Sequence, residues 1–374
     1  MIRYYFHSTL KKNLLSGKMV LIQGPKGIGK ESVVTEICNE LGKTYYILDL
    51  SKKTNRKFFD EVNESMFTDV KFNVDSIIIL EGQYLSNLST LIEFVLSDNI
   101  KQQITITFSY QLNLDIKIQK ALEENEYLHN IYPYTFYELS NEISLPESER
   151  LLDNRILFGS YPSVYNSKNP EIILKSILDQ SLKTIFSRND RVNKINLLRK
   201  VLQIVAMNIG QPLSYFEIGQ LCNLDNETVE RYIDLMINAH LLVKLSCFHN
   251  ENRYELKKSH VFYFLDNGIR NVLINNFNEL EIRSDAENLW RNWLISEKIK
   301  WHKLNGTKSE FFFWQTHTSQ SIDIMEINNN GVNAYRTSLL KKFLKEPPLF
   351  KKYYPEINVQ TLNRLTYLTF LTKK

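Results

Sequence analysis

The chain has 374 residues, of which 43% are hydrophobic, 24% charged and 12% aromatic, as is usual for a folded globular protein. Its 12 glycines and 9 prolines argue against collagen-like and low-complexity chains, and the many aromatic residues argue against disorder. A formal charge of +4 permits a nucleic-acid partner without requiring one. At roughly 100–200 residues per domain, we expect two or three domains.

The cysteines and the apolar pattern indicate the compartment. Cys38, Cys222 and Cys247 stand far apart, which argues against a disulfide framework and against a zinc ribbon. Residues 1–8 are interrupted by polar side chains and lack the apolar core of a signal peptide. No apolar run approaches the roughly 18–20 residues that span a bilayer. We therefore expect a cytoplasmic protein without a membrane partner.

The N-terminal part predicts an α/β fold. Short apolar runs predict strands at 19–23, 44–50, 76–80 and 103–108. Helical stretches separate these runs, so the strands are expected to form a parallel sheet.

From about residue 151, helical periodicity replaces the strands. The predicted helices and the strand after them cover 172–186, 195–208, 212–221, 227–240 and 241–245. Two helices joined by a tight turn at 223–226 and followed by a strand are typical of a winged helix. On the second of these helices, the expected buried stripe is Val229, Tyr232, Ile233 and Met236.

The last third is predicted to be mixed, with a helix over 285–300. Strands are expected at 311–314, 322–327, 332–336 and 364–371. The turn residues at 328–331 predict a hairpin between the second and third of these strands.

A glycine-rich loop between the first strand and the first helix is the strongest chemical signal. Its glycines allow backbone N–H groups to surround a phosphate, and its lysine supplies a positive charge. An ordinary glycine-rich turn is the alternative. The residues expected to bind nucleotide are Gly24, Pro25, Lys26, Gly27, Ile28, Gly29, Lys30, Glu31 and Ser32.

At two positions that usually hold a metal ion near such loops, this chain carries other residues. Glu31 occupies the position of the hydroxyl residue that ligates Mg²⁺ in such loops, and Ser32 comes one residue late. At the end of the third strand, Leu80 replaces an aspartate, while Glu81 remains as the candidate catalytic residue that polarises water. A solvated residue at a strand end is the alternative for Glu81. The pattern supports nucleotide binding more than hydrolysis, with any Mg²⁺ weakly held. The seven histidines show no metal-ligand spacing, so no protein metal site is expected.

The chain resembles the bacterial and archaeal AAA-type P-loop ATPases that end in a winged helix and a PD-(D/E)XK nuclease-like domain. The motifs that carry this resemblance lie, in order, at residues 24–30, 158–162, 213–214, 228–232, 261–270, 289–292, 313–314 and 322–323. The resemblance implies ATP as the cofactor, a polar sensor at Thr107 or Ser109, and a homo-oligomer as an open possibility. Where relatives often carry a Gly-Arg pair, this chain has His129 and Asn130.

The nuclease-like end lacks most of an active site. Such a site needs two carboxylates for Mg²⁺ and a nearby lysine. Asp323 matches the first carboxylate, and Glu297 is a candidate accessory ligand. The strand at 332–336 has neither an acidic residue nor a lysine, and Arg336 cannot act as a base. We expect a nuclease-like fold without nuclease activity.

DNA binding and protein binding both remain open. The expected recognition helix carries three acidic residues against Arg231, which favours packing or a protein partner over DNA. Those acidic residues are Glu227, Glu230 and Asp234. A basic group near the C-terminus is the better DNA-facing patch, although a solvated surface is its ordinary explanation. That group comprises Lys341, Lys342, Lys345, Lys351 and Lys352. Beside it, Tyr353 and Tyr354 are candidates for stacking on bases, with closing a core as the alternative.

Together these features predict a P-loop α/β domain over 1–150, a helical and winged-helix part over 151–265, and a nuclease-like α/β domain over 266–374. The expected function is that of an ATP-binding protein, either a weak ATPase or a nucleotide-gated switch. The alternative is a non-catalytic DNA-binding or protein-interaction protein with the P-loop fold as scaffold.

Overall fold

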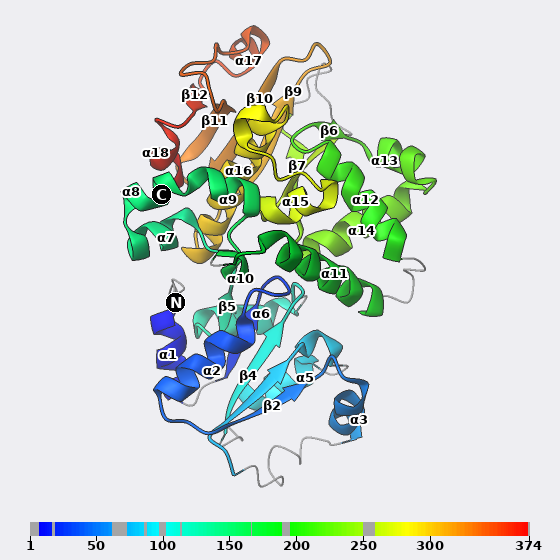
Figure 1. The fold of residues 1–374 in the computed structure, drawn as a ribbon, viewed down its shortest axis with the longest axis vertical. Helices are drawn as coiled ribbons and strands as arrows, with labels where there is room; N and C mark the ends of the chain where they lie inside the picture. The colour runs from blue at the N-terminus through cyan, green and yellow to red at the C-terminus, as the bar shows by residue number, and fades with distance from the viewer. Residues whose placement is uncertain are drawn as a thin grey trace. The chain divides into compact units, whose positions relative to one another are not determined.

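The computed structural model describes residues 7–16, 19–61, 73–85, 88–96, 102–112, 114–165, 167–188, 195–249 and 259–372. The polar segment predicted at the N-terminus lies mostly outside these residues. The chain divides into two compact units, Met1–Tyr132 and Pro133–Lys374, which are taken here one at a time (Figure 1). The division into three parts stays a prediction.

The first unit is built on a five-stranded parallel sheet. Its strands are β1 (Val20–Gln23), β2 (Tyr45–Asp49), β3 (Ser76–Leu80), β4 (Gln103–Phe108) and β5 (Leu128–Asn130). Their order is β2-β3-β4-β1-β5, and all four pairings are parallel. The parallel sheet and four of its strands are confirmed, whereas β5 was not expected. This order places the end of β1 directly beside the end of β4.

Helices follow each of the first four strands. They are α2 (Lys30–Glu40), α3 (Lys53–Glu61), the short 3₁₀ helix η1 (Gly82–Tyr84) with α5 (Leu88–Leu96), and α6 (Ile116–Glu124), while α1 (His7–Leu15) precedes β1. The apolar face of α2 is buried through Val33, Val34, Ile37 and Cys38. This face anchors α2 in the unit and so fixes where the helix begins at Lys30.

Helices make up the first part of the second unit. They are α7 (Phe136–Ile143), α8 (Leu145–Arg150), α9 (Leu152–Phe158), α10 (Pro162–Tyr165), α11 (Pro170–Arg188), α12 (Ile195–Met207), α13 (Tyr215–Cys222), α14 (Asn226–Asn238) and α15 (Asn267–Ile274). Capping boxes begin α7 at Thr135 and α13 at Ser214, and the side chain of Asp225 caps α14. The stripe predicted on α14 is buried as expected.

A seven-stranded sheet joins the middle and the C-terminal parts of this unit. Its strands are β6 (Pro212–Leu213), β7 (Leu242–Cys247), β8 (His260–Phe264), β9 (Glu310–Gln315), β10 (Ser321–Asn328), β11 (Gly331–Thr337) and β12 (Val359–Leu362). Their order is β12-β11-β10-β9-β7-β8-β6. The predicted hairpin is confirmed, because β10 and β11 pair antiparallel up to the turn that ends at Gly331. The 3₁₀ turn η2 (Leu280–Ile282) and the helices α16 (Ala286–Leu304), α17 (Pro348–Tyr353) and α18 (Tyr367–Thr372) complete the unit.

The strand predicted at 364–371 was wrong, because this segment contains the helix α18. The edge position beside β11 is already taken by β12, which pairs with it in parallel. After β12, the backbone N–H of Thr366 donates to the carbonyl of Asn363 at 3.1 Å and turns the chain. Helical spacing then places Tyr367 and Phe370 on one face, where their rings contact those of Trp293 on α16 and of Tyr335 on β11.

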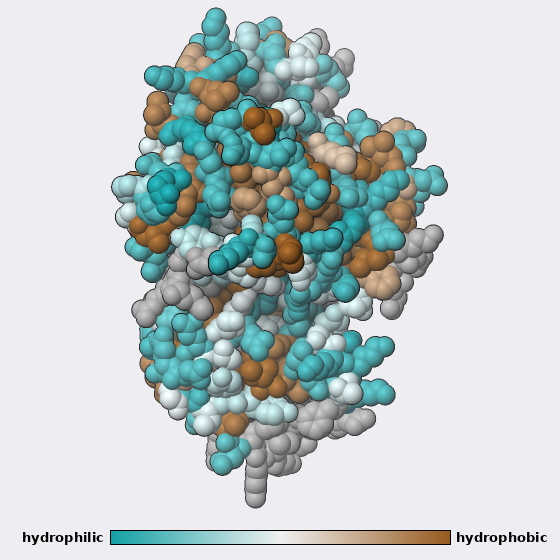
Figure 2. Space-filling model, viewed as in Figure 1, coloured by the Kyte–Doolittle hydropathy of each residue, from teal (hydrophilic) through white to brown (hydrophobic). Residues whose placement is uncertain are grey.

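The surface carries no large continuous apolar area on the face drawn in Figure 2, where brown groups stand apart among teal ones. Within the described ranges, no helix is long and apolar enough to cross a membrane. The three cysteines are buried and free, so the predicted absence of disulfides is confirmed.

Candidate functional site

The glycine-rich loop leaves the carboxyl end of β1 and enters α2. Gly27 and Gly29 have φ angles of 78° and 89°, a left-handed conformation that glycine adopts without steric cost. Gly29 is the N-cap of α2 and has no side chain to cap it, so the first backbone N–H groups of the helix lack that partner. A Cβ on Gly24 would lie 2.2 Å from the carbonyl oxygen of Ile131, so only glycine fits there. The loop therefore presents N–H groups and a positive helix dipole at the sheet edge where α/β proteins bind ligands.

Lys30 is buried inside the loop, with an exposed fraction of 7%. Its Nζ donates to the carbonyl oxygens of Gly24 at 2.8 Å and Pro25 at 2.9 Å, and to Oγ of Ser109 at 3.0 Å. Burial lowers the pKa of Lys30 from 10.5 to about 7; Glu81 opposes this shift, and the charge of Lys26 adds to it. Neutral oxygens thus hold this ammonium, and an anion would stabilise its charged form.

Glu81 directly follows β3 and adopts a left-handed conformation with φ 59°. Its Oε1 accepts from Nζ of Lys26 at 2.5 Å and from Oγ of Ser109 at 2.9 Å. Its Oε2 accepts from the side-chain amide of Gln83. Burial by itself would raise the pKa of this carboxyl, but the charges of Lys30 and Lys26 outweigh it and the pKa is lowered. The carboxylate is therefore ionised at neutral pH and fully engaged by its neighbours.

Of the two sensor candidates, Ser109 lies at the centre of the site. It directly follows β4 and joins Lys30 to Glu81 through one hydroxyl. The other candidate, Thr107, accepts at its Oγ1 from the backbone N–H of Glu81 at 3.4 Å. The position of β4 beside β1 explains why Ser109 reaches the loop.

The structure brings together most of the predicted loop residues and Glu81. Glu31 and Ser32 instead lie exposed on the first turn of α2, and Leu80 is half-buried at the end of β3. Gln83 was not predicted, although its amide joins Glu81 to the backbone N–H of Ser109, which donates to its Oε1 at 3.2 Å. Its place two residues after Glu81, at the same sheet edge, is the signal that would have found it.

The two carboxylates of the expected nuclease-like site do not share a site. Asp323 accepts from the Arg291 guanidinium at 3.0 Å and from the backbone N–H of Thr337 at 2.6 Å. Glu297 accepts from Nζ of Lys300 at 2.5 Å and from the backbone N–H of Phe136 at 2.6 Å. In the ranges that the structure covers, no three His, Cys, Asp or Glu side chains gather as metal ligands. A cation and N–H groups thus occupy the positions where a metal ion would bind.

The surfaces suggested for a partner are exposed. On α14 the three acidic side chains point to solvent beside Arg231. The five lysines near the C-terminus are also exposed, whereas Tyr354 packs in a core cluster with Trp314 and Phe350. Tyr354 therefore closes a core and is not free to stack on a base.

Two protein families match neighbouring stretches of this chain, and one protein is similar to it over most of its length. A family described as "AAA domain" matches residues 16–140, and a family described as "Domain of unknown function (DUF8612)" matches residues 149–280. An uncharacterized protein of Haemophilus influenzae (strain ATCC 51907 / DSM 11121 / KW20 / Rd) is 26% identical over 320 residues, which are 81% of this chain and 77% of that protein.

Solved structures match more remotely. A DNA replication initiation factor is 16% identical with a TM-score of 0.27, over 61% of this chain and 85% of the other. A STAND protein with a tetratricopeptide repeat sensor from Pyrococcus horikoshii is 14% identical with a TM-score of 0.30, over 81% of this chain and 47% of the other. No conclusion rests on likenesses of this size.

For the first unit, the family match and the parallel sheet both indicate a P-loop α/β fold. Residues 16–140 match the AAA domain family, and the parallel sheet of the first unit is consistent with the predicted P-loop fold.

Proposed function

We propose that this chain binds ATP at its P-loop and hydrolyses it slowly or uses it as a switch. The observation that carries the proposal is the buried Lys30 ammonium, held only by neutral oxygens at the uncapped start of α2. A triphosphate is the ligand class that combines strong negative charge with many acceptor oxygens.

The residues present fit a nucleotide. The loop from Gly24 to Lys30 would hold the phosphates through backbone N–H groups and the lysine, as in other P-loops. A bound nucleotide would supply a phosphoryl group for transfer to water. The chain itself contributes Oε1 of Glu81 as the acceptor for a proton from that water.

The residues do not fit a tightly bound Mg²⁺ ion. Leu80 offers no oxygen ligand, and Glu31 is exposed on the outer part of the first helical turn. Glu81 is bound to Lys26 and Ser109, so it must leave both before it can accept a proton. Slow hydrolysis follows from a poorly held metal ion and an engaged carboxylate.

Titration of the full chain with ATP, followed by calorimetry with and without Mg²⁺, tests the proposal. We expect binding in both conditions, and affinity should fall about tenfold between pH 7 and pH 8.5. The sign follows from Lys30, because phosphate favours the charged amine whereas the free protein loses that proton above a pKa of about 7. Binding should therefore take up protons, which buffers of different ionisation enthalpy reveal.

The matched control for this titration is Lys30→Arg, which keeps its charge at every pH used. Its affinity should follow only the titration of ATP itself. Absence of ATP binding at pH 7 would contradict the proposed function, and identical pH profiles of the two proteins would contradict the role of Lys30.

For the second unit we propose a winged helix and an inactive nuclease-like domain. The order α12, β6, α13, α14, β7, β8, with β8 paired to both β6 and β7, supports the winged helix. The helix α16, the strands β9 to β11, the helix α17 and the parallel strand β12 support the nuclease-like fold. The ion pair between Arg291 and Asp323 supports inactivity.

Accordingly, the protein should not cleave DNA. Incubation with linear and supercoiled DNA in Mg²⁺ and in Mn²⁺ should leave both substrates intact, because Asp323 is paired with Arg291 and the described residues hold no group of three or more side chains that could ligate a metal ion. The exposed lysines near the C-terminus would still permit weak, salt-sensitive association. Nicking by the wild type that disappears in Asp323→Ala would show that a metal site forms there.

The alternative is a non-catalytic DNA-binding or protein-interaction protein. We propose that the protein is cytoplasmic. A DNA or protein partner would contact the winged helix or the C-terminal part, and a homo-oligomer is a second form of assembly that mass measurement in solution would detect. The exposed acidic residues of α14 favour a protein over DNA at that helix.

A further inference from the structure

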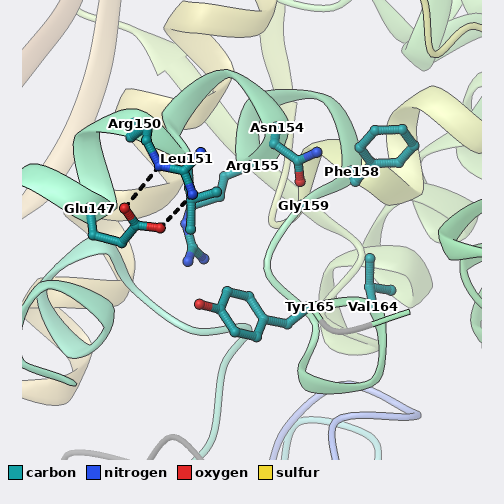
Figure 3. A pocket seen from close by; sticks show the side chains of 9 residues that line it. All are labelled: Glu147, Arg150, Leu151, Asn154, Arg155, Phe158, Gly159, Val164 and Tyr165. Atoms are coloured by element: carbon teal, nitrogen blue, oxygen red, sulfur yellow. Dashed lines mark hydrogen bonds and ion pairs between the residues drawn. The ribbon is translucent and has the colours of Figure 1, made fainter. Parts of the chain in front are cut away.

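A cavity of about 230 Å³ lies in the second unit, among α8, α9 and α10 (Figure 3). Leu151, Phe158 and Val164 supply apolar and aromatic walls, and Arg155 and Tyr165 supply polar groups. A few polar groups within an apolar cavity are typical of a small-molecule site. The volume limits the occupant to a compact molecule.

Arg155 is the unusual residue of this cavity. Only 3% of it is exposed, and its Nε, Nη1 and Nη2 have no hydrogen-bond partner in the described part of the chain. The guanidinium lies over the ring of Tyr165, with Cζ 4.9 Å from the ring centre. That contact stabilises the cation, and the side chain of Tyr165 and the charge of Glu297 both favour its charged form. Because arginine stays charged in proteins, the cavity wall holds a buried cation with no carboxylate in ion-pair contact among the described residues.

The nearby carboxylates are already engaged. Glu147 accepts from Nε of Arg150 at 2.8 Å and from Nη2 at 2.6 Å, as the dashed lines of Figure 3 show. Glu297, whose charge influences Arg155, is bound by Lys300 and the backbone N–H of Phe136. Among the described residues, these carboxylates are thus bound by other groups, and the guanidinium of Arg155 can still receive an anion.

We propose that this cavity binds a small organic anion, a carboxylate or phosphate ester with a compact apolar or planar group. Two oxygens of such an anion match the planar fork of a guanidinium. The apolar part would lie against Leu151, Phe158 and Val164, and the ring of Tyr165 turns aside to admit the anionic group. This site is independent of the proposed nucleotide site.

The test is titration of the full chain with phenyl phosphate, benzoate and inorganic phosphate, followed by calorimetry. Phenyl phosphate or benzoate should bind at least about tenfold more tightly than inorganic phosphate, because only they fill the apolar walls. Arg155→Lys should weaken the tighter probe by at least about tenfold, because it keeps the charge and loses the fork. The matched control is Arg199→Lys, whose guanidinium pairs with Asp179 and does not line the cavity, and whose effect should stay below about threefold.

Two further variants separate the outcomes. In Lys30→Ala, the probe should bind as in the wild type; a parallel loss would place the probe in the P-loop and overturn the proposal. Leu151→Trp places a larger side chain in the cavity but keeps Arg155, and it should abolish binding, which keeps the test valid if Arg155→Lys fails to fold. Equal binding by the wild type and Leu151→Trp, or no binding of any probe at millimolar concentration, would overturn the proposal.

Discussion

Lys30→Ala is expected to weaken ATP binding by about one to two orders of magnitude. The wild-type ammonium is buried and presents its N–H donors to the loop, where charge-assisted hydrogen bonds contribute about 1.5–3 kcal/mol. Alanine removes both the charge and the donors but leaves the glycines and the start of α2 in place. Calorimetric titration at pH 7 measures the change in dissociation constant.

The matched control is Lys120→Ala, which removes an exposed lysine of α6 whose ion pair with Glu124 is 3.6 Å long. It should leave ATP affinity unchanged. Circular dichroism checks that both variants remain folded. Equal ATP affinity of the wild type and Lys30→Ala would show that the loop lysine contacts no phosphate and would remove the basis for the nucleotide site.

Restoring both missing ligands should raise ATP turnover. Glu31→Thr supplies the hydroxyl after the loop lysine, and Leu80→Asp supplies the carboxylate at the end of β3. Both changes act on one Mg²⁺ ion, so their combined effect should exceed the product of the single effects. We expect at least about tenfold faster phosphate release from the double variant, measured under saturating ATP and Mg²⁺.

The controls for this gain keep size and remove the ligand. Glu31→Val has the shape of threonine without its hydroxyl, and Leu80→Asn has the shape of aspartate without its charge. Their combination should not raise turnover. Rapid ATP hydrolysis by the unmodified protein would contradict the argument, because it would mean that another group already holds the metal ion.

The ion pair between Lys26 and Glu81 affects both the expected ATP affinity and the expected ATP turnover. It holds the remaining candidate catalytic carboxylate at 2.5 Å from a lysine of the loop itself. A phosphate bound by the loop would compete for Lys26, and this competition would free Glu81. Nucleotide binding and release of the carboxylate are therefore expected to be coupled.

Local sequence determined the elements whose signals are complete within a few residues. The glycines before Lys30, the continuous apolar runs of β1 to β4 and the helical stripe on α14 each required no distant partner to be recognised. The same holds for the hairpin of β10 and β11, because turn residues and alternation specify it locally. Glu81 was predicted as a candidate because its position after a buried strand places it at the ligand-binding edge.

Tertiary structure decided the elements and side-chain pairings that depend on segments distant in the sequence. Three-residue β5 forms because β1 offers it an edge, and residues 367–372 turn helical because β12 already fills the place beside β11. Ser109 and Gln83 join the site only through the order of the parallel strands. Arg291 pairs with Asp323 from another element, and among the described residues Glu147 and Glu297 pair with Arg150 and Lys300 and not with Arg155. Such pairings depend on distances between segments far apart in the chain, and folding alone sets those distances.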